Sequence, residues 1–315
     1  MHRSTRTRIR TVLGTVTLAA SLGLGLSGCG TAPAPVAPRG AGSALAAQDS
    51  AVLRLSELER SYKGRIGAFA LDTGNGRVVS YRAHERFPFA STFKAMTGAA
   101  ILHKARRSDP GLLDRRLHWT KKDLLPNSPI TEQHVEDGLT VAELCHAAIT
   151  RSDNTAANVL LGQLDGPAGL TRFLRSIKDP VSRLDRYETD LNIWKPGQKR
   201  DTTTPAAVGR DLAGLAVGRT LAPPDRARLN GWLRANLTGD ARIRAGVPKG
   251  WIVGDKTGTG STYGTANDIA VVTPPHHAPL IIAVYTNRKD PKGQADESVI
   301  ARTTSILVDA LGLTR

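Results

Sequence analysis

The chain of 315 residues contains only two cysteines, Cys29 and Cys145. A disulfide framework therefore does not hold this protein together, and a chain of this length can instead bury a sizeable hydrophobic core. Aromatic residues are also scarce, with 4 Trp, 5 Tyr and 5 Phe. Because there is no recognisable nucleic-acid-binding motif either, we expect no nucleic-acid partner despite the formal net charge of +15.

Histidine and cysteine clusters with the spacing of a zinc site are missing as well. The pair His276–His277 lies in a proline-rich connection, where we expect solvated rather than metal-bound imidazoles. We therefore expect no metal and no cofactor. The basic residues are spread along the chain, and three interpretations stay open: a solvated basic surface, steering of anionic substrates, or association with anionic envelope polymers.

The N-terminus lacks a run long enough to span a membrane but has the layout of an export signal. The stretch "MHRSTRTRIR" carries four arginines and no acid, and a short run of apolar and small residues follows it up to Cys29. "LSGC" (Leu26 to Cys29) resembles a bacterial lipobox, in which the cysteine is acylated; the alternative is an ordinary signal peptide with a chance cysteine. We expect residues 1–28 to be a lipoprotein-type signal peptide. The mature protein is then expected to be anchored in the cell envelope by Cys29, and release outside the cell is a further expectation.

Residues 29–47, rich in Ala, Pro and Gly, are typical of a flexible tether.

Strand patterns occur at both ends of the remaining chain, and helical patterns lie between them. Apolar strand-like runs occupy 65–73, 77–83, 250–258, 267–275 and 279–288, and helical spacing occurs at 50–63, 92–104, 140–150, 155–164, 166–177, 205–216, 225–237 and 295–313. This order predicts an α/β sandwich whose five-stranded, mainly antiparallel sheet is built from both chain ends and flanked by helices. An all-α domain is inserted, with the active site between the two. The expected bounds are 48–84 and 235–315 for the α/β domain, and 85–234 for the all-α domain.

The segment 179–204 is long and charged, and it lacks sustained periodicity. A loop of this length inside a compact domain usually has a functional reason. It places Glu188 four residues before Asn192.

Three short motifs carry the chemistry. Ser91 and Lys94 stand three residues apart at the start of a helical run, so both side chains lie on one face, where the amine can hydrogen-bond the hydroxyl and draw its proton. "SDN" (Ser152 to Asn154) lies at a turn that starts a helix, and "KTG" (Lys256 to Gly258) closes a strand. Each motif alone has a plain structural explanation, such as an N-cap or a surface lysine. The ordered set is far more specific.

On these motifs the chain resembles the class A β-lactamases, serine hydrolases of the penicillin-recognising group, from residue 50 to the C-terminus. The resemblance implies that Ser91 is the acylated nucleophile, that Lys94 is its neighbouring amine, and that Ser152 relays a proton to the departing β-lactam nitrogen. Glu188 would deprotonate the deacylating water with the help of Asn192. A carboxylate base of this kind typically contributes about 10²–10⁴-fold.

The same resemblance assigns the substrate-binding residues. Asn154 would hold the substrate's side-chain amide. Lys256 and Thr257 would meet its carboxylate within the K-T-G motif that Gly258 completes, and the backbone N–H groups of Ser91 and Thr259 would form the oxyanion hole. An ion pair between Arg186 and Asp201 would close the 179–204 loop. Whether Lys94 or Glu188 is the acylation base stays open, as it does for the family.

Departures from the family pattern bear on the substrate range. Ala266 stands where many relatives carry a carboxylate-binding arginine, and Arg242 is the candidate replacement, with an exposed surface arginine as the alternative. Asn127 occupies a position where relatives usually have an aromatic gate, and Thr189 replaces a common proline.

Cysteine positions add two further expectations. Ala90 and Gly260 replace the cysteine pair of the class A carbapenemase subgroup, so we do not expect carbapenem hydrolysis as the main activity. Cys145 should be a free thiol, because its partner position in some relatives reads Gly98.

Two other functions share the same motifs. A peptidoglycan D-Ala-D-Ala peptidase or transpeptidase would lack a deacylating carboxylate, and Glu188 argues against it. A β-lactam-sensing module would acylate and signal through an attached transmembrane or effector segment, and we expect none after Arg315. The sequence therefore favours a monomeric β-lactamase that acts on penicillins, with cephalosporins as further expected substrates, and that confers resistance to β-lactam antibiotics.

Overall fold

A five-stranded antiparallel sheet organises residues 41–313, the part of the chain that the computed structural model describes. Its strand order is β2-β1-β9-β8-β7. The predicted strands and the predicted sheet from both chain ends are confirmed. The bounds are β1 (Gly64–Asp72), β2 (Val78–Tyr81), β7 (Ile252–Thr259), β8 (Ala266–Thr273) and β9 (Leu280–Arg288).

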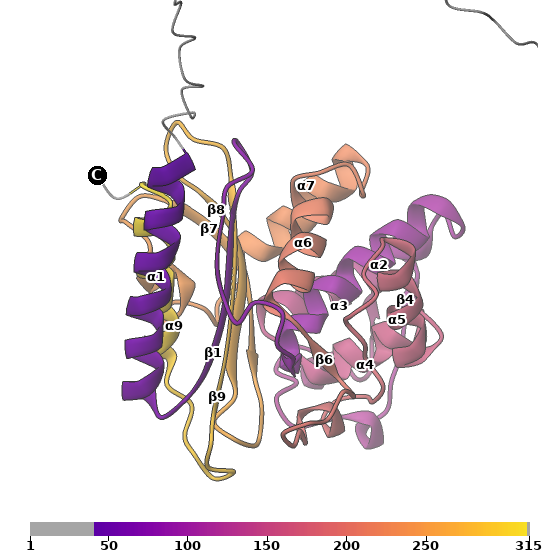
Figure 1. Cartoon of the computed structure of the whole chain (residues 1–315). Coiled ribbons are helices and arrows are strands. Elements are labelled where there is room, and N and C mark those ends of the chain that lie inside the picture. The colour runs from indigo at the N-terminus through magenta and orange to yellow at the C-terminus, as the bar shows by residue number, and fades with distance from the viewer. Residues whose placement is uncertain (1–40, 314–315) are drawn as a thin grey trace, which may run out of the picture. The chain divides into compact units, whose positions relative to one another are not determined.

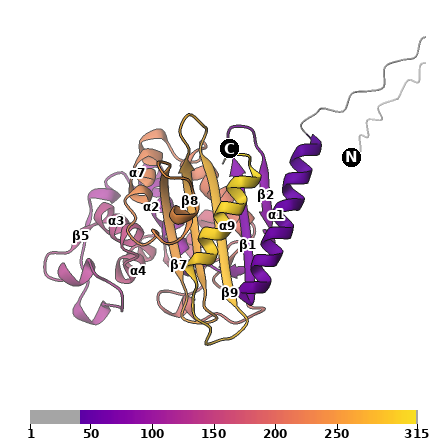
Figure 2. The same ribbon diagram turned by 90° about the vertical axis from the view of Figure 1, so that its left-hand side faces the viewer.

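Helices cover both faces of this sheet (Figure 1). α1 (Ala41–Tyr62) and α9 (Glu297–Ala310) lie across one face, as Figure 2 shows. α6 (Pro205–Ala216) contacts β1, β8 and β9 on the other. β9 is buried along almost its whole length, which explains why its sequence is a continuous apolar run rather than an alternating one.

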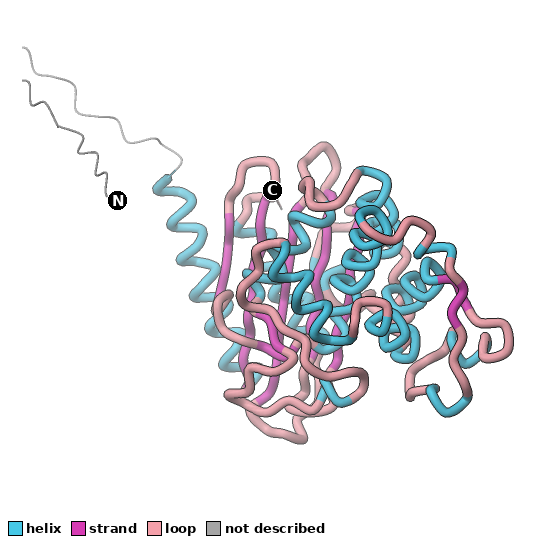
Figure 3. Tube along the Cα trace, turned by 90° about the vertical axis from the view of Figure 1, so that its right-hand side faces the viewer, coloured by secondary structure: helices cyan, strands magenta, loops and turns pink. Residues whose placement is uncertain are grey.

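A group of helices packs around α2 (Phe93–Arg107) on the side of the sheet that α6 covers (Figure 1). Figure 3 views the molecule from this side, with the helices in cyan in front of the sheet. Residues 93–102 of α2 are all buried, so this helix forms the centre of the helical part. Its neighbours are α3 (Val141–Thr150), α4 (Asn154–Gly162), α5 (Gly166–Ser176) and α7 (Pro223–Arg234). The smaller elements are α8 (Ile243–Gly246), β3 (Phe87–Pro88), β4 (Arg116–Leu117), β5 (Leu139–Thr140) and β6 (Thr202–Thr203).

One hydrophobic core joins the helical part to the sheet. It runs from Leu144 and Leu160 in the helices to Phe69 and Tyr285 in the strands. A second core, which includes Leu55, fills the space under α1 and α9. The division at residues 84/85 and 234/235 therefore stays a prediction, because the helical core is continuous with one face of the sheet.

The tether prediction was wrong at its C-terminal end. Helix α1 begins at Ala41, inside the expected tether of residues 29–47. The stretch "AGSALAAQ" is rich in alanine, the residue with the highest helix propensity, so a helix nucleated by the buried Leu55 and its neighbours extends into it at little cost. The leader, Cys29 and residues 29–40 lie outside the described residues. Within 41–313, no helix combines the length and hydropathy needed to cross a membrane.

Two further expectations can be compared with the structure. The segment between Asp179 and Thr204 is irregular as predicted, with only the short helix η5 (Asp190–Asn192) and strand β6 inside it. Cys145 is a free thiol buried in α3.

A buried carboxyl group on α6 gives the protein a testable pH dependence. Asp211 is 7% exposed, and its Oδ2 has no hydrogen-bond partner among the described residues. Burial, and next the nearby Asp179 carboxylate, raise the pKa of Asp211 to about 9. The Asp211 carboxyl group therefore stays protonated in the folded protein up to about pH 9, whereas in the unfolded chain it loses its proton near pH 4. The contribution of Asp211 to stability is accordingly lost as the pH rises from about 4 to about 9.

We therefore expect Asp211→Asn, which resembles the protonated side chain, to gain stability relative to wild type as the pH rises. The gain should be at most about 1.4 kcal/mol per pH unit and should level off above about pH 9. Urea unfolding of both proteins between pH 5 and 10 measures it. A difference that does not change with pH would contradict the assignment.

Candidate active site

The hydroxyl of Ser91 faces a carboxylate across the site. Ser91 lies in the short helix η1 (Ala90–Thr92), directly before α2, and is 8% exposed. Its Oγ donates to Glu188 Oε1 at 3.2 Å. β7 passes close by, since a Cβ on Gly258 would lie 3.1 Å from the backbone nitrogen of Thr92. A glycine at position 258 therefore lets the edge strand approach the segment that carries Ser91.

Lys94 contacts the same carboxylate oxygen. Its Nζ lies 3.1 Å from Glu188 Oε1, with both side chains fully buried. It also donates to Ser152 O at 2.7 Å and to Asn154 Oδ1 at 2.6 Å. Burial lowers the pKa of Lys94, and the Glu188 charge partly opposes this shift. The direct Lys94–Ser91 hydrogen bond expected from the spacing is not formed, because the Glu188 carboxylate takes both groups as donors.

The 179–204 loop holds Glu188 from two sides. Asn192 Nδ2 donates to Glu188 Oε2 at 2.6 Å, which fits the joint role that the family resemblance implied for these two residues. Asn158 on α4 bonds both the N–H and the C=O of Glu188, each at 2.9 Å. The Glu188–Thr189 peptide bond is cis. The sequence interpretation missed Asn158, although it stands four residues after Asn154 and so shares its helix face.

Ser152 lies between two amines. Its Oγ accepts from Lys256 Nζ at 3.1 Å and, at a longer 3.4 Å, from Lys94 Nζ. Lys256 is fully buried in β7, and burial, followed by the charge of Lys94, lowers its pKa well below the usual value. A hydroxyl with two amines of lowered pKa beside it is suited to pass a proton on.

A hydrogen-bonded loop holds the S-D-N turn in place. Asp153 caps α4 and also accepts from the backbone N–H groups of Ile130 and Thr131. The side chain of Asn154 donates to Pro126 O at 2.7 Å. The predicted turn at the start of a helix is thereby confirmed, and the loop before it supplies one rim of the site.

Asn127 joins that rim directly to the turn. Its backbone oxygen accepts from Asn154 N at 3.0 Å. Its side chain donates to Ser152 O at 3.1 Å, so Asn127 bonds on both sides of the S-D-N turn. The position where an aromatic gate was expected in relatives therefore holds a small polar side chain that fixes the backbone of Ser152.

The opposite wall is the edge strand β7. Thr257 Oγ1 lies 2.6 Å from Thr238 Oγ1, and Arg242 Nη2 donates to Thr259 Oγ1 at 2.7 Å. Arg242 also donates to Gly258 O at 2.9 Å and forms an ion pair with Glu297 at 2.8 Å. The sequence interpretation missed Thr238 and Glu297, because their contacts with β7 and Arg242 join segments that lie far apart in the chain.

Arg242 is not the exposed surface arginine of the alternative interpretation. Its side chain is 4% exposed. Ala266, at the start of β8, pairs with Thr259, and Arg242 Nη1 donates to the next carbonyl, Asn267 O, at 2.7 Å. The guanidinium therefore lies beside the position where a cation was expected on the strand after K-T-G.

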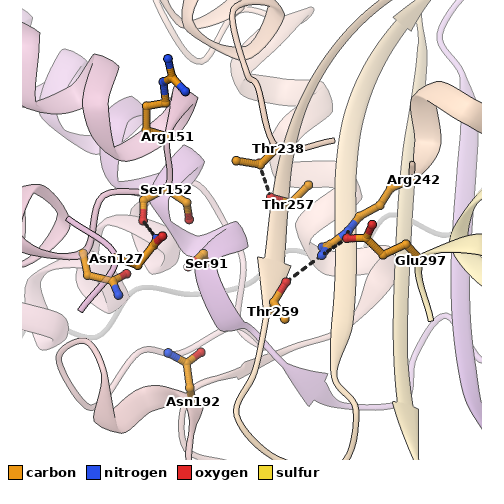
Figure 4. Close-up of a pocket in the computed structure, with 11 residues that line it drawn as sticks. Ser91, Asn127, Arg151, Ser152, Asn192, Thr238, Arg242, Thr257, Thr259 and Glu297 are labelled. Carbon is orange, nitrogen blue, oxygen red and sulfur yellow. Dashed lines mark hydrogen bonds and ion pairs between the residues drawn. The ribbon is translucent and has the colours of Figure 1, made fainter. Parts of the chain in front are cut away.

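These residues surround a cavity of about 400 Å³. Figure 4 shows Ser91 in the middle of the cavity, with Asn192 at one end and Arg151 at the other. Lys94, Glu188 and Lys256 lie buried behind this lining. The lining residues are Ser91, Asn127, Arg151, Ser152, Asn154, Asn192, Thr238, Arg242, Thr257, Thr259 and Glu297.

The arrangement can perform an acyl transfer followed by hydrolysis. It brings a serine hydroxyl, two amines of lowered pKa, a second hydroxyl and a carboxylate into one hydrogen-bonded group. The carboxylate, held by Asn192, is placed to bind a water molecule as well as the serine.

Comparison with known proteins gives consistent matches over most of the chain. The model of the family described as "Beta-lactamase enzyme family" matches residues 51–311. Beta-lactamase AST-1 of Nocardia asteroides is 51% identical over 259 residues, which cover 82% of this chain and 83% of that protein. The carbapenem-hydrolyzing beta-lactamase KPC of Klebsiella oxytoca is 49% identical over 258 residues, covering 82% of this chain and 88% of that protein. The crystal structure of a beta-lactamase from Streptosporangium roseum has a TM-score of 0.83 and 60% identity, covering 84% of this chain and 99% of that chain.

Proposed function

Since this chain belongs to the class A β-lactamases, we propose that it opens the β-lactam amide of penicillins and cephalosporins through an acyl-enzyme on Ser91. One observation carries the proposal. Ser91 Oγ and Lys94 Nζ both contact Oε1 of Glu188, whose other oxygen is held by Asn192. The hydroxyl proposed as nucleophile and the carboxylate proposed as hydrolytic base therefore contact each other in one site.

In the acylation step, Ser91 Oγ attacks the β-lactam carbonyl carbon. The hydroxyl proton passes to Glu188, whose Oε1 accepts from Ser91 Oγ, or to Lys94, whose Nζ lies 3.1 Å from the same Oε1. The backbone N–H groups of Ser91 and Thr259 stabilise the oxyanion. The C–N bond then breaks as Ser152 donates its proton to the departing nitrogen. Lys94 returns the proton taken from Ser91 to Ser152 Oγ, since its Nζ contacts both Glu188 Oε1 and Ser152 Oγ, and Glu188 is again a free carboxylate.

In the deacylation step, Glu188 takes a proton from water as the water oxygen attacks the ester carbonyl. The ester C–O bond breaks, the proton returns to Ser91 Oγ, and the ring-opened acid leaves. The N–H and C=O of Glu188 are fixed by Asn158, which keeps the carboxylate in place for this step.

The substrate range is proposed from the cavity and from the relatives. One relative is named as carbapenem-hydrolyzing, but Ala90 and Gly260 in this chain leave no cysteine pair at those positions. We place penicillins and cephalosporins before carbapenems for this reason. Arg242 and the K-T-G strand supply the cationic and hydroxyl groups that a ring carboxylate needs.

Ring absorbance tests this proposal directly. The purified protein should hydrolyse benzylpenicillin and a cephalosporin faster than imipenem, and its expression in a susceptible host should raise the inhibitory concentration of penicillins. Faster hydrolysis of imipenem would overturn the proposed range. A stable covalent adduct without turnover would instead identify a penicillin-binding peptidase or a sensor.

Removal of the Arg242 cation should weaken substrate recognition. We expect Arg242→Ala to lower kcat/KM for benzylpenicillin by about 10–100-fold, as the loss of a charge-assisted hydrogen bond would. Arg242→Lys keeps the charge but not the planar guanidinium, so its kcat/KM should lie between those of wild type and Arg242→Ala. Unchanged kcat/KM in the alanine variant would show that Arg242 only supports β7.

Export and anchoring by lipid on Cys29 form the remaining part of the proposal. The lipobox-like "LSGC" at the end of the apolar leader supports it. We expect wild type to incorporate radiolabelled fatty acid and to partition with membranes, and Cys29→Ala to do neither. Equal partitioning of the two proteins would reject the anchor without touching the enzymatic proposal.

A further inference from the structure

Arg151 is a cation at the mouth of the cavity that the proposed mechanism does not use. It is the C-cap residue of α3 and directly precedes Ser152. The residue is exposed and lines the cavity, and Figure 4 shows it at the end opposite Asn192. Its position follows from the helix end, where its backbone N–H donates to Ala147 O at 3.0 Å.

The guanidinium of Arg151 has no protein partner among the described residues. Within that part of the chain, its side chain forms no ion pair and no hydrogen bond, whereas the other arginine of the cavity, Arg242, is paired with Glu297 at 2.8 Å. Five N–H donors of a planar, permanently charged group are therefore available to a ligand in the cavity.

The surroundings of Arg151 identify which end of a β-lactam it faces. Its neighbour Ser152 is the proposed proton donor to the ring nitrogen, and this nitrogen is bonded to the carbon that carries the ring carboxylate. The backbone of the 236–238 segment lies beside the C-terminal end of α3, next to Arg151, since Leu237 N donates to Thr150 O at 3.1 Å. Thr238 in this segment bonds Thr257, a proposed carboxylate-binding residue.

The acylamino side chain of the substrate points the other way. Asn154 is its proposed partner, and Asn192 marks the opposite end of the cavity from Arg151 (Figure 4). A substituent on the carboxylate-bearing ring therefore lies toward the end of the cavity that Arg151 lines, and the acylamino side chain lies toward the other end. In cephalosporins this ring carries a substituent on C3, next to the carbon that bears the carboxylate.

On the basis of the proposed function, we propose that Arg151 binds an anionic C3 substituent and makes cephalosporins with a second negative charge at that position preferred substrates. The guanidinium is exposed to solvent, so the preference is modest. The attraction of two charges about 4 Å apart in a largely aqueous setting corresponds to about 3–10-fold in kcat/KM.

The test uses two cephalosporins that differ only at C3, one with a carboxylate on the C3 arm and one with the methyl ester of that carboxylate. We expect wild type to favour the carboxylate by about 3–10-fold in kcat/KM, mainly through KM, and the preference to shrink at high salt. Arg151→Gln should abolish the preference, and Arg151→Glu should reverse it. Arg219→Gln removes an equal charge from an exposed site outside the cavity lining and should keep the wild-type ratio.

A second substrate pair separates local recognition from a general effect of charge. Benzylpenicillin and its analogue with a carboxylate on the acyl side chain should give the same rate ratio in wild type and in Arg151→Gln. An equal loss for both pairs, or an unchanged ratio for the C3 pair, would overturn the proposal. If wild type were acylated without turnover, the proposed function would fail, and the same ratios would be read from acylation rates by mass spectrometry.

Discussion

Glu188→Gln should leave the enzyme able to react with benzylpenicillin but slow the hydrolysis of the acyl-enzyme by about 10²–10⁴-fold. Glutamine has nearly the shape of glutamate, so it keeps the space beside Ser91 and Asn192 filled. It cannot accept a proton from water at neutral pH, because an amide is not a base. The rate of deacylation should therefore fall more than the rate of acylation, whichever group accepts the proton of Ser91.

Stopped-flow ring absorbance measures this effect. The variant should show a burst of ring opening close to one equivalent of enzyme, followed by a slow steady state, while wild type should show no such slow phase. Asp190→Asn is the matched control, because it removes a carboxylate from an exposed position two residues further along the same loop. We expect its kinetics to stay within about twofold of wild type. A Glu188→Gln variant with near-normal turnover would exclude Glu188 as the deacylation base.

Asp201→Asn should both destabilise the protein and slow deacylation. Asp201 is fully buried, and its Oδ2 accepts from Arg186 Nε at 2.6 Å. Its Oδ1 accepts from the backbone N–H groups of Asp185 and Arg186 at 2.7 and 2.9 Å. Loss of the charge leaves Arg186, which is 21% exposed, without its carboxylate partner, and this should cost about 2–4 kcal/mol.

The loop closed by this ion pair carries Glu188, so its loosening should also reduce deacylation by about 10-fold or more. Chemical unfolding, limited proteolysis and single-turnover kinetics measure the three effects. Asp165→Asn serves as control, because it removes a carboxylate from an ion pair with Arg172 in which both side chains are exposed, and the loss should be within about 1 kcal/mol. Wild-type kinetics and protease resistance in Asp201→Asn would show that the ion pair does not hold the loop.

Short motifs with a defined place on a helix, turn or strand made it possible to predict that four side chains lie near one another. These are Ser91, Lys94, Ser152 and Lys256. The antiparallel sheet could be predicted because apolar strand patterns at both chain ends need each other to bury their faces. These predictions depend on local patterns, which a single sequence displays.

Other features depend on contacts between distant segments. Asn158 acts on Glu188 only because α4 packs against the 179–204 loop, and Thr238 reaches Thr257 only because the segment after α7 runs beside β7. The Lys94–Ser91 bond was predicted from helical spacing alone, and the carboxylate brought in by the loop replaces it. The start of α1 was missed because an alanine-rich segment is compatible with both a tether and a helix.

Intact-protein and peptide mass spectrometry of the reaction with benzylpenicillin shows whether Ser91 is acylated and whether Glu188 is needed to remove the acyl group. Wild type and Glu188→Gln are mixed with the substrate and quenched at intervals, and the adduct is located by digestion. We expect an adduct on Ser91 in both proteins, short-lived in wild type and persistent in the variant. An adduct that persists equally in both proteins would rule out Glu188 as the deacylation base, and ring opening without any adduct on Ser91 would rule out Ser91 as the nucleophile.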